Sequence, residues 1–174
     1  MMLETGQILL QAVMIALLAR IAVRDFRTQR IANGDVLALA ALGIAALVLK
    51  ALWRLDQLQT GVWWNVTMSL IVAVALFALL LPFWLTRKLG AGDVKLMAAA
   101  PLVAGAEGML AFALFLLGFA LVTALLVKNP MLLPAPLFRQ YLEHFERKGV
   151  VPFGVPIAAA LICVVALRGL AVIR

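Results

Sequence analysis

Long runs of apolar residues, separated by short polar gaps, most strongly constrain the fold of this 174-residue chain. A run of about 20 apolar residues crosses the hydrocarbon core of a bilayer as a helix, within a usable range of roughly 17–25. Apolar residues make up 66% of the sequence and charged residues 13%, which excludes an ordinary soluble domain. We therefore expect an all-α membrane protein: one domain over residues 1–174, folded as a bundle of six transmembrane helices with short loops. The predicted spans are 7–24, 35–52, 62–84, 92–106, 109–127 and 153–173.

The positive charges predict how this bundle lies in the membrane. Lys and Arg gather in the gaps after the first, third and fifth spans, and loops rich in these residues face the cytoplasm. Both termini are then extracytoplasmic. The net charge of +7 reflects this topology rather than nucleic-acid binding, because the basic residues do not share one amphipathic face. In the longest gap, an apolar face over 137–148 predicts a helix lying among the lipid headgroups.

Two acidic residues at the predicted cytoplasmic ends of spans are the candidates for chemistry. Asp25 follows the first span, and Asp93 opens the fourth. An Asp at the bilayer centre costs about 2.5–3.5 kcal/mol, so an acid beside a span is a functional hypothesis by default. Packing of these two spans would bring the carboxyls together on one face. Two apposed carboxyls hold one proton between them, so one can activate a water while the other polarises a peptide carbonyl.

Simpler interpretations of the same residues stay open on the pattern alone. Gly90 and Gly92 leave the backbone beside Asp93 open to close approach, yet they equally suit a turn into the fourth span with Asp93 as its N-cap. Asp25, which lies among arginines, equally suits a salt bridge. With one Cys and one His in the chain, we expect no zinc site, no other metal and no cofactor.

Three motifs together resemble the type IV prepilin leader peptidases, which are aspartic intramembrane proteases of the GxGD type. They are Asp25 with Ile31 and Asn33, then Gly90-Ala91-Gly92-Asp93-Val94-Lys95, and then Val151-Pro152-Phe153-Gly154. The chain resembles the short CpaA/TadV-like branch that serves Flp pili. The resemblance implies an endopeptidase that removes the leader from prepilins or pseudopilins during pilus biogenesis and secretion. It would act at the cytoplasmic face of the bacterial inner membrane, without a separate methyltransferase segment.

The resemblance also implies the site residues. Asp25 and Asp93 would be the catalytic pair, with supporting or substrate-binding roles for Gly90, Gly92, Lys95, Asn33, Arg27, Pro152 and Gly154. Lys95 lies two positions from Asp93, so on a helix it should point to a different side. It would bind a leader carboxylate, tune the pair or only reach the headgroups.

Two functions of other classes stay open on the sequence. One is a small proton or ion transporter that uses Asp25 and Asp93, and the other is a non-catalytic factor for pilus or secretion assembly. A transporter should carry its acids near the bilayer midplane and often shows repeated halves. Here the acids are expected at one face, and the sequence shows no repeat.

Overall fold

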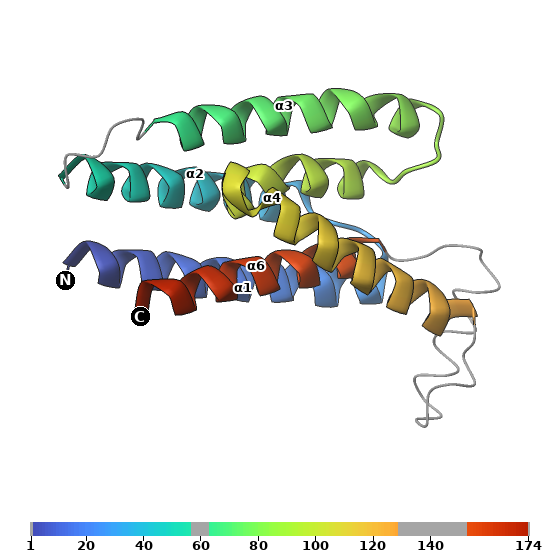
Figure 1. Cartoon of the computed structure of the whole chain (residues 1–174). Coiled ribbons are helices and arrows are strands. Elements are labelled where there is room, and N and C mark those ends of the chain that lie inside the picture. The colour runs from blue at the N-terminus through green and yellow to red at the C-terminus, as the bar shows by residue number, and fades with distance from the viewer. Residues whose placement is uncertain (1, 57–62, 129–152, 174) are drawn as a thin grey trace.

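The computed structural model describes residues 2–56, 63–128 and 153–173. These residues form α-helices and no strands, which confirms the all-α prediction for the described part of the chain. The helices are α1 (Met2–Thr28), α2 (Asn33–Asp56), α3 (Trp64–Leu85), α4 (Ala91–Lys128) and α6 (Gly154–Ile173) (Figure 1). The first four of them are long and apolar enough to cross a membrane, so the chain is a membrane-embedded protein.

Helix α4 is central to the bundle. It packs against α2, α3 and α6, while α6 also lies along α1 (Figure 1). The N-terminal end of α1 and the C-terminal end of α6 lie at the same end of the bundle (Figure 1). The opposite end therefore holds the C-terminal end of α1 and the starts of α2, α4 and α6, and this is where the candidate acids lie.

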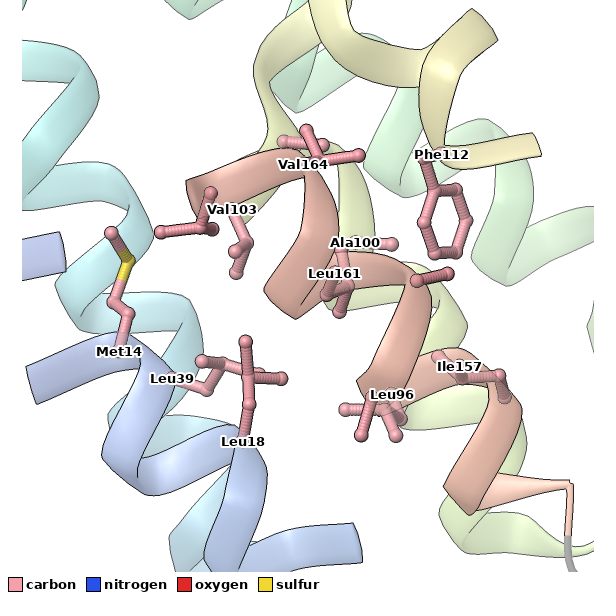
Figure 2. Close-up of a cluster of buried hydrophobic side chains, with 14 of the residues drawn as sticks. Met14, Leu18, Leu39, Leu96, Ala100, Val103, Phe112, Ile157, Leu161 and Val164 are labelled. Carbon is pink, nitrogen blue, oxygen red and sulfur yellow. The ribbon is translucent and has the colours of Figure 1, made fainter. Parts of the chain in front are cut away.

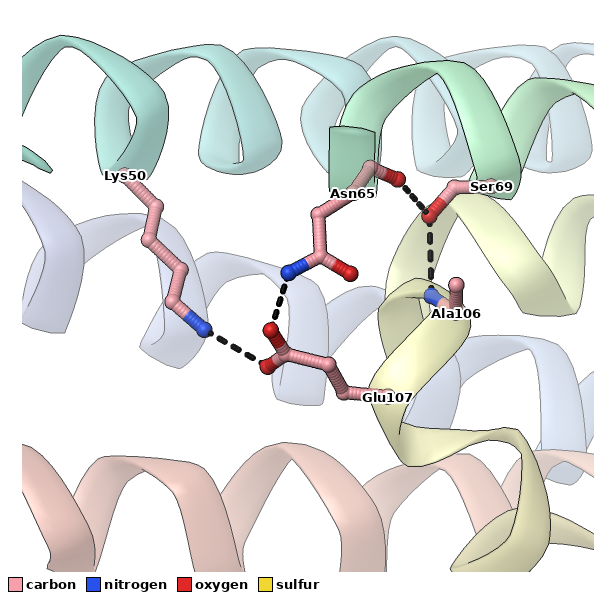
Figure 3. A network of polar contacts seen from close by, with 5 residues as sticks. All are labelled: Lys50, Asn65, Ser69, Ala106 and Glu107. Atoms are coloured by element: carbon pink, nitrogen blue, oxygen red, sulfur yellow. Dashed lines mark hydrogen bonds and ion pairs between the residues drawn. The ribbon is translucent and has the colours of Figure 1, made fainter. Parts of the chain in front are cut away.

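A sharp bend divides α4 into a first arm, 91–104, and a second arm, 106–128. Gly105 at the bend has φ 62° and ψ 162°, a conformation that only glycine adopts without strain. The backbone N–H of Ala106, which the bend removes from the helical ladder, donates to Ser69 Oγ of α3 at 2.9 Å (Figure 3). Ser69 is buried and its hydroxyl donates in turn to the Asn65 carbonyl at 2.6 Å. The broken backbone is thus satisfied by a neighbouring helix.

This bend is where the structure differs from the six predicted helices. The expected spans 92–106 and 109–127 form the single helix α4, so the described residues contain five helices rather than six. As a straight rod its 38 residues would be about 57 Å long, far more than the roughly 30 Å of a hydrocarbon core. Instead the second arm turns back toward the end at which the first arm began (Figure 1). The hydropathy pattern correctly predicted that the chain reverses direction here. It predicted a loop at the reversal, whereas the structure has a helix that bends at Gly105.

The core is built where α1, α2, both arms of α4 and α6 meet (Figure 2). Leu18, Leu39, Leu96 and Leu161 are fully buried, and Phe112 of the second arm is 2% exposed. Small residues of the first arm and of α6 are also fully buried, namely Ala100, Ala104, Ala158 and Ala160. Because lipid tails are as apolar as leucine, helices associate in a bilayer through close packing, which small residues permit. This packing holds the starts of α4 and α6 together.

Two predictions fall on other parts of the chain. The expected headgroup helix over 137–148 and the candidate residue Pro152 lie outside the described residues.

Candidate active site

Asp25 occupies the last turn of α1 rather than a loop after it. The helix continues four residues past the predicted end of the first span, and Gln29 N–H donates to the Asp25 carbonyl at 2.8 Å. The Asp25 residue is only 5% exposed. The backbone N–H groups of Gly154 and Val155, at the start of α6, face its carboxyl, whereas Oδ2 has no hydrogen-bond partner among the described residues. The Asp25 carboxyl thus faces the start of α6, and its Oδ2 atom accepts no hydrogen bond from the described residues.

Asp93 lies in the first turn of α4, half-buried at the same end of the bundle. The backbone carbonyl of Gly90 accepts from Val94 N–H at 3.2 Å, so Gly90, and not Asp93, precedes the helix as its cap. A Cβ atom on Gly90 would lie 3.0 Å from Asp93 Oδ2. The interpretation of Asp93 as the N-cap is therefore wrong. Asp93 lies within the first turn, and its side chain folds back toward Gly90, which precedes the helix.

The carboxyls of Asp25 and Asp93 lie at the same end of the bundle, near enough for the charge of Asp25 to act on Asp93. One structural reason is Ile31, from the connection between α1 and α2, which is wedged between two glycines. A Cβ on Gly92 would lie 2.9 Å from Ile31 Cβ, and one on Gly154 would lie 2.9 Å from Ile31 Cδ1. The lack of side chains at Gly92 and Gly154 lets α4 and α6 close around this residue. The Gly154 position would also bring a Cβ to 2.6 Å from Asp25 Oδ2.

Lys95 and Asn33 form a second element of the site. Lys95 Nζ donates to Asn33 Oδ1 at 2.9 Å, which joins the first turn of α4 to the start of α2. Lys95 thus points away from Asp93, as its two-residue spacing predicted, and its partner is another of the residues that the motifs singled out. Arg27 is exposed in the last turn of α1.

Sequence reasoning missed a buried acid near this site. Asp35, the first residue of the second predicted span, lies inside the first turn of α2 and is 8% exposed. Its carboxyl oxygens lie 3.6 Å from Arg20 Nη2 and 3.6 Å from Arg24 Nη1 of α1. Arg20 and Arg24 are four residues apart and so share one helix face, a spacing that could have signalled a common acidic partner. The ion pairs hold α2 against the part of α1 that carries Asp25.

An apolar groove runs along the bundle beside Asp93. It has a volume of about 410 Å³, and α3, both arms of α4 and the start of α6 line it. Its residues include Leu89, Asp93, Met97, Ala113, Leu117, Ala120, Phe153 and Ile157. The described residues contain no cluster of three or more His, Cys, Asp or Glu side chains that would hold a metal ion. This end of the bundle thus presents two carboxyls, one of which borders an apolar groove.

Fold and site together define a helical membrane protein with an interacting pair of aspartates at one end of its bundle. The chain belongs to the type IV leader peptidase family, whose model matches residues 12–127. The match covers both aspartates, and membership makes the chain a protease that processes prepilin-type substrates. It favours the peptidase over the transporter and the assembly factor. No match was found among curated proteins or among solved structures.

Proposed function

We propose that this protein is an aspartic endopeptidase that cuts the leader from type IV or Flp-type prepilins, with Asp25 and Asp93 as its catalytic pair. The observation that carries the proposal is that α4 and α6 close around Ile31 at Gly92 and Gly154, so that the carboxyls of Asp93 and Asp25 lie at one end of the bundle, where the charge of Asp25 acts on Asp93. Asp25 is buried against the start of α6, and Asp93 borders the apolar groove. An arrangement of one enclosed and one accessible acid suits a pair that must share a proton and still reach a substrate.

The proposed reaction needs only water and the two acids. The ionised aspartate takes a proton from a water molecule, whose oxygen attacks the carbon of the scissile peptide carbonyl. The protonated aspartate donates its proton to the carbonyl oxygen, so that the tetrahedral intermediate is neutral. Its collapse breaks the C–N bond: the aspartate that took the proton from water donates it to the leaving nitrogen, and the other aspartate takes a proton from a hydroxyl of the intermediate. The products are the leader carboxylate and the new N-terminus of the pilin, and the aspartates regain one shared proton.

The groove beside Asp93 suits the part of a prepilin that follows the cut. That part is a hydrophobic segment, and the groove offers an apolar wall formed by residues such as Met97, Leu117 and Ile157. A segment lying there would bring its first peptide bond to the carboxyl that borders the groove. Holding the bond at the pair in this way converts an encounter into an intramolecular step, which lowers the barrier substantially.

The basic gaps indicate where the cut occurs. The connections that carry Arg27, Arg30, Arg87 and Lys88 lie at the same end of the bundle as the aspartates. By the positive-inside rule this end faces the cytoplasm, in the inner membrane of a bacterium. Both termini of the chain are then extracytoplasmic, and the two arms of α4 act as separate passes.

The test is cleavage of a purified prepilin, with the loss of the leader read by mass. We compare the wild type with Asp25→Asn and Asp93→Asn. Asp35→Asn is the matched control, because Asp35 is also buried at this end but pairs with Arg20 and Arg24. Each catalytic variant should lose about 10²- to 10⁴-fold in rate, as expected for a general acid or base, and the control should cleave. Undiminished cleavage by either catalytic variant would refute the pair.

A further inference from the structure

A second cavity, with one polar and one apolar wall, lies at the end of the bundle opposite the aspartates. Its volume is about 350 Å³, within the lower part of the range of roughly 300–1,000 Å³ that small-molecule sites occupy. Gln7 and Gln11 line it from the N-terminal part of α1, Lys50 from the C-terminal part of α2, and Arg168 from the C-terminal part of α6. Glu107 lines it from the start of the second arm of α4. The proposed peptidase reaction uses none of these residues.

The charges in this cavity do not balance. Lys50 Nζ lies 3.1 Å from Glu107 Oε2, and Asn65 Nδ2 donates to the other carboxylate oxygen of Glu107 (Figure 3). Arg168 also interacts with the charge of Glu107. The described lining residues thus carry two cations and one anion, which leaves one positive charge in excess. An intramembrane arginine is costly and calls for a partner, and one shared carboxylate does not neutralise both cations.

Two glycines at the bend of α4 create the space for the Arg168 guanidinium. A Cβ on Gly105 would lie 3.0 Å from Arg168 Nη1, and one on Gly108 would lie 2.9 Å from Arg168 Nη2. The planar guanidinium is therefore held at the edge of the cavity by a surface without side chains. A guanidinium presents its donors as a fork that matches the oxygens of a phosphate. The amides of Gln7 and Gln11 supply further donors on the α1 side.

The remaining wall of the cavity is apolar. It consists of Met14, Gly43, Ala46, Leu47, Val103 and Val165. A ligand that fits both walls carries one net negative charge at one end and hydrocarbon at the other. We propose that this cavity binds the headgroup phosphate of an anionic phospholipid, with Arg168 and Lys50 as its cationic contacts. The proposal is independent of the peptidase reaction, because its residues lie at the other end of the bundle from Asp25 and Asp93.

Native mass spectrometry of the purified full chain tests this site. The probes are phosphatidylglycerol, which has a net charge of −1, phosphatidylethanolamine, which is zwitterionic, and inorganic phosphate. The wild type should retain one phosphatidylglycerol at least about tenfold more tightly than phosphatidylethanolamine. Both lipids offer a phosphate for charge-assisted hydrogen bonds, but in phosphatidylethanolamine the lipid's own ammonium already compensates the phosphate charge. Arg168→Gln should lose this preference. Arg87→Gln, which removes an exposed arginine at the other end, should keep it.

Each other outcome is informative. Equal retention of the two lipids by the wild type, or an unchanged preference in Arg168→Gln, would overturn the proposal. Inorganic phosphate that displaces phosphatidylglycerol at an equal concentration would show a site for free phosphate and would also overturn it. If Arg168→Gln does not fold, Lys50→Gln replaces it, because the Lys50 side chain is 35% exposed and its loss should be tolerated. That variant should also lose the preference for phosphatidylglycerol.

Discussion

A single methyl group added at Gly154 tests how closely α6 is fitted to the Asp25 carboxyl. In Gly154→Ala, the new Cβ would lie 2.6 Å from Asp25 Oδ2 and 2.9 Å from Ile31 Cδ1. Ordinary van der Waals contact begins near 3.4 Å, so the carboxylate oxygen must retreat by about 0.8 Å if the helix does not move. Because a misplacement of about 1 Å can cost about 10²-fold in rate, we expect kcat/KM for prepilin cleavage to fall by roughly 10- to 100-fold.

The loss should appear in activity far more than in stability. Alanine is favoured over glycine within a helix by about 1 kcal/mol, which offsets part of an overpacking cost of roughly 1–3 kcal/mol. The matched control is Gly34→Ala, in the first turn of α2 at the same end, because a Cβ there meets nothing within 4 Å. The assay is leader removal at several prepilin concentrations, with thermal unfolding measured on the same samples. Equal kcat/KM for Gly154→Ala and Gly34→Ala would show that Asp25 is not held by this contact.

Further predictions concern the rest of the site. Lys95→Met and Asn33→Leu should destabilise non-additively, with a coupling free energy of about 0.5–1.5 kcal/mol in a double-mutant cycle of thermal unfolding; strict additivity would argue against their hydrogen bond. Asp35→Asn should lower the free energy of unfolding by only roughly 1–2 kcal/mol, because its arginine partners are largely exposed to solvent. Added salt should reduce the difference in unfolding free energy between this variant and the wild type, because salt screens the ion pairs. Ala113→Trp should fill the groove beside Asp93 and raise KM for prepilin severalfold, whereas Ala75→Trp, on an exposed face of α3 outside the groove, should not; equal KM values would place the substrate elsewhere.

The helical class could be predicted from the sequence because hydrophobic length is a local property. The position of the bend in α4 could not. Glu107 interrupts the apolar run and so suggested a loop, but a chain continues as a helix wherever its backbone groups find partners. At Gly105 the partner is Ser69, far away in the sequence. Only tertiary packing shows that such a break is tolerated, so two predicted helices form one helix in the described part of the chain.

The candidate site was predictable to a similar degree. Asp25 and Asp93 could be assigned to one end because topology places the ends of alternate spans together. The burial and the neighbours of their carboxyls could not be predicted from the sequence, since they depend on how each helix is rotated about its axis. The same limit hid Asp35, whose burial follows from the face that α1 turns toward α2. Side-chain pairs between helices require that rotation to be known.

Whether Asp25 and Asp93 act as one unit is the central claim, and the double variant measures it most directly. Residues that share one chemical step lose activity together, so removing the second costs little once the first is gone. Single-turnover cleavage of prepilin should therefore be equally low in Asp25→Asn, Asp93→Asn and the double variant. Measurable residual rates in the singles that multiply to give the rate of the double variant would contradict a shared-proton pair.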